Sequence, residues 1–177
     1  MRTGTEVAPL LLLCAALAGS LACQAAPLTR NAQPVAQHGE TMIVARLNGL
    51  DVSADLLTHD AFIGSASDQP PKRATLNCTY SHVPCVLVDS LEISVGGREV
   101  AVPRSAFGDL SDVWTARLQL TAKGRFGLIL VGGDASESYE AEIIFDRRRV
   151  RERIITDGEA QMVSEKTVYF DVSSAFR

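Results

Sequence analysis

Two cysteines and a histidine form the sharpest chemical pattern in this sequence, Cys78-x3-His82-x2-Cys85. In an oxidising compartment two such cysteines usually form a disulfide, and we predict a Cys78–Cys85 bond that closes a short loop. The alternative is a metal site, because two thiolates and an imidazole are ligands that zinc and copper accept. No second CxxC or HxxxH pair reinforces that alternative, so the disulfide is favoured.

Oxygen donors alternate along residues 134–138, where Asp134 and Glu137 are the carboxylates. This spacing is that of the start of an EF-hand loop, but Tyr139 stands where that loop needs Gly, and Phe145 where it needs a bidentate Glu. We therefore predict a polar turn between two strands, with an irregular cation site at Asp134 and Glu137 as the alternative.

Five arginines fall within seven residues, and such a cluster can bind phosphate or an acidic partner. If the chain turns at Arg147-Arg148, Glu142 lies opposite Arg153, and the cluster becomes an ion-paired, solvated strand face. We favour this structural interpretation over a binding patch. The five residues are Arg147, Arg148, Arg149, Arg151 and Arg153.

Few residues could support catalysis. The chain has 3 histidines, no G-x-S-x-G elbow, no P-loop and no dinucleotide fingerprint. We expect no catalytic residues and no cofactor, and a non-enzymatic protein is favoured over an enzyme. The net charge of -4 provides no general attraction for nucleic acid, so no nucleic-acid partner is expected.

The first residues have the composition of an export signal. Residues 7–22 are almost all apolar or small, and this run is shorter than the roughly 20 residues that a membrane span needs. We predict a signal peptide over residues 1–22, with an uncleaved anchor as a lesser alternative. The protein is then exported.

The end of this signal, Ser20-Leu21-Ala22-Cys23, resembles the lipobox of bacterial lipoproteins. The resemblance implies lipidation of Cys23 as the mature N-terminus, and Gln24 after it implies anchoring in the outer membrane. Ordinary signal-peptidase cleavage after the same small residues is the alternative and gives a soluble periplasmic or secreted protein. The expected membrane contact is confined to this possible lipid anchor.

Residues 23–39 show neither a period of two nor one of 3.6, which predicts a flexible tether. Residues 40–177 then form a single domain of ordinary size. Its clearest element is a hairpin over residues 90–102, where two alternating segments flank Gly96-Gly97. A two-residue loop places Ile93 opposite Val100 and Leu91 opposite Val102.

Similar alternation or continuous apolarity predicts further strands, and residues 126–131 are the candidate centre of a sheet because they are apolar throughout. Helical turns are expected only at residues 103–110 and 53–57. The fold class is therefore all-β, an antiparallel sandwich or small barrel of about seven to eight short strands. The other predicted strands cover residues 41–47, 114–120, 139–145, 150–155 and 167–170.

The expected function is that of a non-enzymatic binding or accessory protein of the cell envelope. Its partner is a protein or an envelope component, bound chiefly by the loops around residues 56–85 and 132–138. One alternative is a carrier of a small apolar ligand inside a β-barrel; another is a metal-dependent enzyme that uses Cys78, His82 and Cys85. The carrier's cavity would be lined by Trp114, Phe126, Leu128, Leu130 and Ile143.

Overall fold

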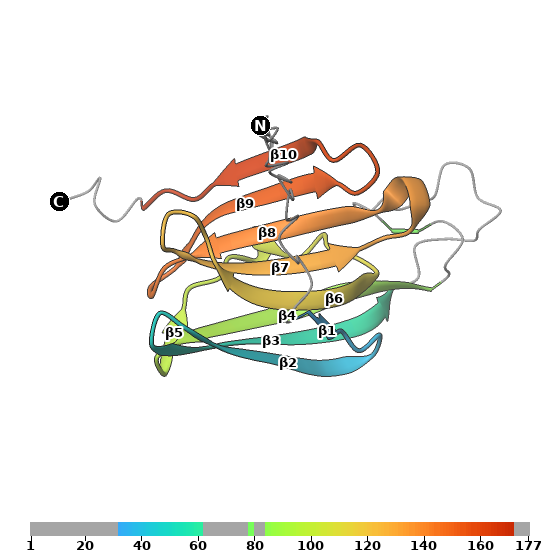
Figure 1. Cartoon of the computed structure of the whole chain (residues 1–177). Helices are drawn as coiled ribbons and strands as arrows, with labels where there is room; N and C mark the ends of the chain where they lie inside the picture. The colour runs from blue at the N-terminus through green and yellow to red at the C-terminus, as the bar shows by residue number, and fades with distance from the viewer. Residues whose placement is uncertain (1–31, 62–77, 80–83, 172–177) are drawn as a thin grey trace, which may run out of the picture.

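The computed structural model describes residues 32–61, 78–79 and 84–171, which form two antiparallel β-sheets packed face to face (Figure 1). Six strands form the larger sheet, in the order β1-β6-β7-β8-β9-β10, and four form the smaller, in the order β2-β3-β4-β5. The predicted antiparallel sandwich is confirmed. The larger sheet contains β1 (Gln33–Pro34), β6 (Val113–Leu120), β7 (Phe126–Gly132), β8 (Tyr139–Phe145), β9 (Val150–Asp157) and β10 (Val163–Val168). The smaller contains β2 (Gly39–Leu47), β3 (Leu50–Ala61), β4 (Cys85–Val95) and β5 (Arg98–Val100).

The core lies between the two sheets and follows the alternation of the sequence. Along β8 every second residue, from Tyr139 to Phe145, is buried. Strand β7 is apolar throughout and is buried on both faces, as predicted for the centre of a sheet. On its outer face Ile129 is paired with Arg117 and Glu142 of the neighbouring strands, whose aliphatic parts can shield it.

Tight turns join the strands at one end of the sandwich. Asn48-Gly49 and Gly96-Gly97 have positive φ angles of 51°, 75°, 58° and 75°, which suit two-residue hairpin loops. The predicted pairing of Ile93 with Val100 is confirmed. The second predicted pair, Leu91 with Val102, is not formed, because β5 ends at Val100 and Ala101 bridges to Arg149 instead.

One of the two predicted helical turns is present. Residues Arg104–Ala106 form a 3₁₀ turn, η1, after Pro103. The prediction for residues 53–57 is wrong, since they lie within β3, where Ala54 and Leu56 point into the core. Their period of two, continued by Val52, outweighs any local helical preference.

The end of the predicted tether packs on the domain. Gln33 and Pro34 pair with β6, the Val35 N–H donates to the Trp114 carbonyl at 2.9 Å, and the Val35 side chain is buried. The described domain thus begins before residue 40. Residues 23–31 of the predicted tether, like the predicted signal, lie outside the described residues. No helix in the described part of the chain is long and apolar enough to cross a membrane.

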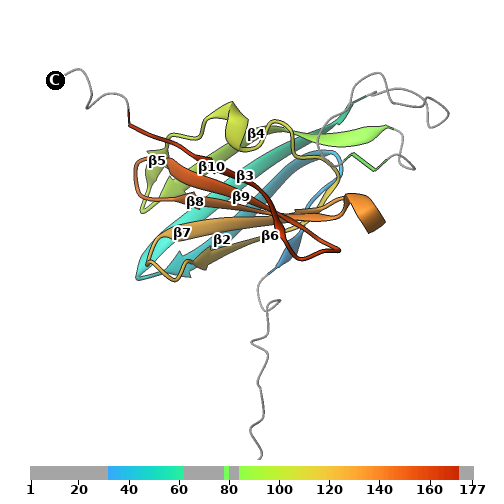
Figure 2. The ribbon, with the colours of Figure 1, turned by 90° about the horizontal axis from the view of Figure 1, so that it is seen from above.

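The two ends of the sandwich differ, as both views show (Figures 1 and 2). We call one the hairpin end; it carries the turns at 48–49, 96–97, 121–125 and 146–149. We call the other the disulfide end. It carries Cys78 and Cys85, the segment 110–112 before β6, and the connections 133–138 and 158–162, the former including the 3₁₀ turn η2 (Ala135–Glu137).

Candidate functional site

The predicted disulfide between Cys78 and Cys85 is formed, with the two Cα atoms 5.9 Å apart and both side chains buried. His82 of the alternative metal set lies outside the described residues. A carboxylate oxygen of Asp112 lies 3.8 Å from Cys85 Sγ, but a disulfide sulfur carries no proton to donate. Zinc binds thiolates, so a metal at these cysteines would first require reduction of the bond.

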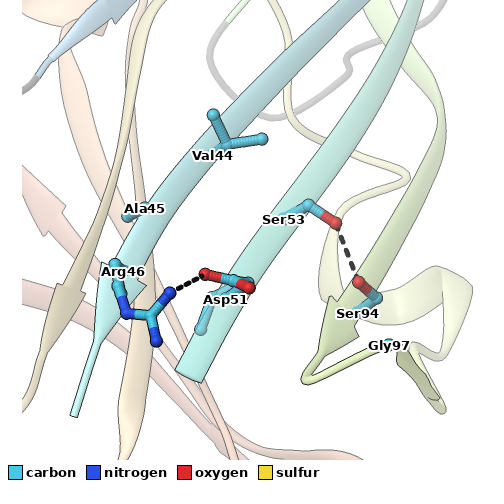
Figure 3. A pocket seen from close by; sticks show the side chains of 8 residues that line it. Val44, Ala45, Arg46, Asp51, Ser53, Ser94 and Gly97 are labelled. Carbon is cyan, nitrogen blue, oxygen red and sulfur yellow. Dashed lines mark hydrogen bonds and ion pairs between the residues drawn. The ribbon is translucent and has the colours of Figure 1, made fainter. Parts of the chain in front are cut away.

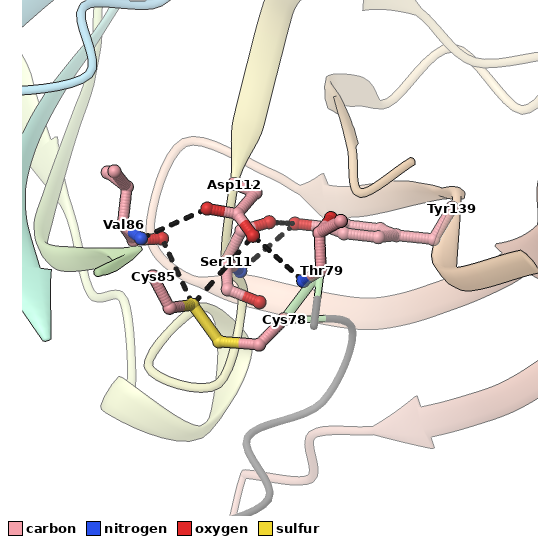
Figure 4. The surroundings of a disulfide bond; sticks show 7 residues. All are labelled: Cys78, Thr79, Cys85, Val86, Ser111, Asp112 and Tyr139. Carbon is pink, nitrogen blue, oxygen red and sulfur yellow. Dashed lines mark hydrogen bonds between the residues drawn. A yellow bond between two sulfur atoms is a disulfide. The ribbon is translucent and has the colours of Figure 1, made fainter. Parts of the chain in front are cut away.

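Asp112 is the central residue of the disulfide end and is only 1% exposed. Its Oδ2 accepts a hydrogen bond from the Thr79 N–H at 2.9 Å, and its Oδ1 accepts one from the Val86 N–H at 3.0 Å (Figure 4). Its carbonyl accepts a bond from the Gly133 N–H at 3.1 Å. One side chain thus holds the chain on both sides of the disulfide, and its backbone holds the start of the 133–138 connection.

The burial and the backbone conformation of Asp112 both cost free energy. A buried carboxylate loses its hydration and must recover it through hydrogen bonds within the protein. Asp112 also has a φ of 47°, in the left-handed region that few residues other than glycine adopt. Ala135 and Gln161, at 45° and 54°, share this conformation at the same end; among the described residues the other non-glycine case is Asn48 in its hairpin.

Tyr139 supports the same segment from β8. Its hydroxyl donates to the Ser111 carbonyl at 2.7 Å and accepts from the Ser111 N–H at 3.1 Å (Figure 4). Burial raises the pKa of the Tyr139 phenol well above its usual value, and the nearby Asp112 charge raises it further, although the bond to Ser111 opposes this. The phenol therefore stays protonated and serves as a structural clamp.

Gly132, the last residue of β7, and Gly133, the first of the 133–138 connection, make this packing possible. A side chain at Gly132 would lie 2.6 Å from the Tyr139 hydroxyl oxygen. Gly133 has a φ of 69°, and a Cβ there would collide with the backbone carbonyl of Glu137. The connection folds back so tightly that only glycine fits.

Asp134 and Glu137 lie in this connection as a polar turn. Asp134 Oδ1 accepts a bond from the Ala135 N–H at 2.8 Å, and the Asp134 carbonyl accepts one from the Glu137 N–H at 2.9 Å. Asp134 therefore caps η2. Among the described residues, neither carboxylate belongs to a cluster of three potential metal ligands, and the cation site remains an untested alternative.

The arginine cluster turns where predicted, but its register differs from the prediction. The Asp146 N–H donates to the Arg149 carbonyl at 3.1 Å across the Arg147-Arg148 loop. A bulge then shifts the pairing, so that Arg153 lies opposite Ile143 and not opposite Glu142. The predicted Glu142–Arg153 pair is therefore wrong, because one extra residue in a strand moves all later side chains to the other face.

The shift buries Arg153, whose side chain is only 4% exposed. It donates to the Asp109 carboxylate at 2.9 Å and to the Ser105 carbonyl at 3.0 Å, which attaches η1 to β9. Arg151 pairs with Asp146, and Arg149 with Asp171 at 3.5 Å. Arg147 and Arg148 are exposed at the tip of the loop. Arg153 is thus buried and separate from the exposed arginines of the loop, and the binding patch remains a prediction.

Asp146 anchors the 146–149 turn of the hairpin end, much as Asp112 anchors segments of the disulfide end. Unlike Asp112, Asp146 is partly exposed to water. Burial raises the pKa of its carboxyl, yet hydrogen bonds from the Arg148 N–H, the Arg151 side chain and the Arg149 N–H together lower it below its usual value. The side chain of Asp146 is 32% exposed.

The residues proposed to line a carrier's cavity are mostly packed in the core. Phe126, Leu128, Leu130 and Ile143 are buried in one cluster, and Phe126 stacks on Phe145 with ring centroids 5.8 Å apart. Trp114 is half-buried and donates from Nε1 to the Gly133 carbonyl at 2.7 Å. These contacts give the carrier alternative no support, and it remains a prediction.

The sequence alone gives no indication of the role of Asp112. No local signal could have identified it, because its partners Thr79 and Val86 lie 33 and 26 residues away in the chain. No protein-family model, curated protein or solved structure significantly matches this chain.

Proposed function

We propose that this chain is an exported, non-enzymatic binding or accessory protein of the cell envelope, which recognises its partner through the disulfide end. The Cys78–Cys85 bond supports export, since disulfides persist in oxidising compartments and are rare in the cytosol. The resemblance of residues 20–23 to a lipobox supports a periplasmic protein held in the outer membrane by lipid on Cys23. Soluble release after ordinary cleavage is the alternative.

The observation that carries the proposal is the buried carboxylate of Asp112 with both oxygens bonded to backbone N–H groups. A carboxylate held in this way positions two segments of the chain. Tyr139 is bonded through its hydroxyl in both directions, and the two sulfurs are bonded to each other. Among the described residues of this end, these groups thus hold the connections in place. Connections held on a rigid scaffold are the usual recognition elements of sandwich proteins.

The described surface of this end is acidic and partly apolar. Residues 133–138 and 158–162 contain no Lys or Arg, while they include Asp134, Glu137 and Glu159. Met162 is 69% exposed in the second of these connections. The Gly158 N–H donates to the Ser138 carbonyl at 2.8 Å, which joins the two connections. This surface suits a partner that presents basic groups around an apolar contact.

Affinity capture from envelope extracts with variants of altered charge tests this proposal. Glu137→Arg and Met162→Arg alter the disulfide end, and Lys123→Glu is the matched control on the exposed turn of the hairpin end. We expect a partner that the native chain and the control retain and that both variants lose by about tenfold or more. The proposal would be contradicted if only the control lost the partner, or if the native chain repeatedly captured no specific partner.

A further inference from the structure

Strand β2 is the long, open sheet edge in the described part of the molecule. The other three edges are protected by features that natural sheets use against edge-to-edge association. Strand β1 has 2 residues, one of them Pro34, and β5 has 3. Strand β10 has a register shift after Val163 and carries charged residues at its centre. By contrast β2 pairs with β3 without interruption over its 9 residues.

The free backbone groups of this edge belong to every second residue. The two-residue Asn48-Gly49 loop makes Leu47 and Leu50 a hydrogen-bonded pair, and such pairs then alternate along the hairpin. The N–H and C=O groups of Glu40, Met42, Val44 and Arg46 therefore point away from β3. The Gly96 N–H donates to the Asp51 carbonyl at 2.7 Å, which fits this alternation, because Asp51 is opposite Arg46 and faces β4.

The side chains of the same four residues lie on the exposed face of the smaller sheet. Met42 and Val44 are 62% and 60% exposed, although both are large and apolar. Val44 borders an open hollow of about 640 Å³ together with Ser53 and Ser94 (Figure 3). A second hollow, of about 310 Å³, runs along the edge itself between Val44 and Leu118. Backbone groups and apolar side chains are thus both available at this edge.

We propose that β2 pairs antiparallel with β2 of a second copy of this chain, about a two-fold axis at Ile43. In chain order the four exposed side chains are acidic (Glu40), apolar (Met42 and Val44) and basic (Arg46). This order is self-complementary, because an antiparallel copy presents its basic end to the acidic end of the first. The symmetric pairing places Glu40 opposite Arg46 of the second copy and Met42 opposite Val44 of the second copy. Each free N–H and C=O then faces a free partner of opposite kind.

Other pairings do not match these side chains. A shift by two residues in either direction places a charged residue opposite Met42 or Val44. A parallel arrangement brings Glu40 beside Glu40 of the second copy, and like charges directly opposite are unfavourable. The existing Arg46–Asp51 pair at 3.2 Å is mostly exposed and therefore contributes little that the new pair must replace. The symmetric contact is closed, since it uses the open edge of both copies.

Sedimentation equilibrium of the purified exported chain with charge-exchanged variants tests this inference. Arg46→Glu brings two carboxylates together across the contact, and Glu40→Lys brings two cations together there. Each variant alone should therefore dimerise about tenfold or more weakly than the native chain. The double variant Glu40→Lys/Arg46→Glu should regain native dimerisation. An equimolar mixture of the two single variants should also form dimers, because one of the two charge contacts in the mixed pair joins the two substituted residues, which carry opposite charges, and the other joins the two native ones.

Both positions are exposed, and far-ultraviolet circular dichroism would verify that each variant is folded. A native chain that stays monomeric up to about millimolar concentration, where even weak complexes form, would overturn the inference. A dimer that is indifferent to the charge exchanges would also overturn it, as would pairing of this edge with an unrelated protein while the mixed variants fail to associate.

Discussion

The chain reverses direction at both ends of the sandwich, but different interactions hold the reversals in place at each end. At the hairpin end, loops such as Asn48-Gly49 and Gly96-Gly97 reverse the chain with local backbone geometry alone. At the disulfide end the connections are longer and are held by a covalent bond and by the buried side chains of Asp112 and Tyr139. The hairpin end closes the fold with short local turns, whereas the disulfide end fixes irregular segments in defined positions.

The contrast is clearest in the two aspartates. Asp112 and Asp146 each accept hydrogen bonds from two backbone N–H groups, but Asp112 is buried and Asp146 is partly exposed. Water can replace a partner that is lost at Asp146, while none reaches the N–H groups at Asp112 so easily. Water-accessible groups suffice to anchor the local turn at Asp146, whereas the irregular segments at Asp112 are anchored by buried groups.

The largest expected effect comes from removing the Asp112 carboxylate. Asp112→Ala leaves the buried N–H groups of Thr79 and Val86 without an acceptor and should lower the free energy of unfolding by about 4 kcal/mol. The matched variant Asp146→Ala should cost about 1 kcal/mol, because water can bond the exposed N–H groups. Urea denaturation of both variants measures the difference. Equal losses of unfolding free energy in the two variants would contradict this difference between the two ends.

Glycine substitution gives the next largest effect. Gly97 and Gly133 both have positive φ angles, but a Cβ at Gly97 meets open space while one at Gly133 meets the Glu137 backbone. Gly97→Ala should therefore cost about 1 kcal/mol and Gly133→Ala about 3 kcal/mol or more. Thermal unfolding of the two variants compares them, and a smaller loss for Gly133→Ala would contradict the tight packing of the 133–138 connection.

Loss of the disulfide should have an intermediate effect. The cross-link spans a sequence separation of 7 residues, and the entropy of closing so short a loop corresponds to about 2 to 3 kcal/mol. The variant Cys78→Ala/Cys85→Ala should therefore unfold at lower urea concentration than the native chain. Its hydrogen exchange should accelerate more at Val86 than at Val95 of the same strand. Uniform acceleration of exchange along β4 would show instead that the bond stabilises the whole sheet.

The smallest effect concerns pH. Because burial raises the Tyr139 pKa above its unfolded value, the native state keeps a proton that the unfolded state loses, and stability falls as pH rises above about 10. Tyr139→Phe should cost about 1 to 2 kcal/mol at neutral pH and should lose stability less steeply above that pH. Urea midpoints measured from about pH 7 to 11 test this; parallel profiles would refute a buried, protonated phenol.

Much of the fold was predictable because it rests on local patterns. The alternation in β8, the continuous apolarity of β7 and the Gly96-Gly97 turn each follow from a few neighbouring residues. The Cys78–Cys85 bond was predictable because the predicted domain contains two cysteines, so each thiol has one possible partner within it. The bulge that buries Arg153 was not, because a single inserted residue leaves the apolar pattern of β9 almost unchanged.

The candidate site was predictable only in outline. The 133–138 connection and the cysteines were recognised, but the sequence does not show that Asp112 joins them. Its hydrogen-bond partners, Thr79 and Val86 of β4, are far away in the chain. Long-range contacts between polar groups have no periodic signal. For the same reason the pairing of residues 33–35 with β6 could not be distinguished from a free tether.

Site-specific photo-crosslinking in intact envelopes tests the central claim most directly, that the disulfide end is the recognition surface. A crosslinking residue is placed at Ser136, in η2 of the disulfide end, or at Lys123, in the exposed turn of the hairpin end. The account predicts a discrete crosslinked product from Ser136 and none from Lys123. A product from Lys123 alone, or equal products from both positions, would contradict it.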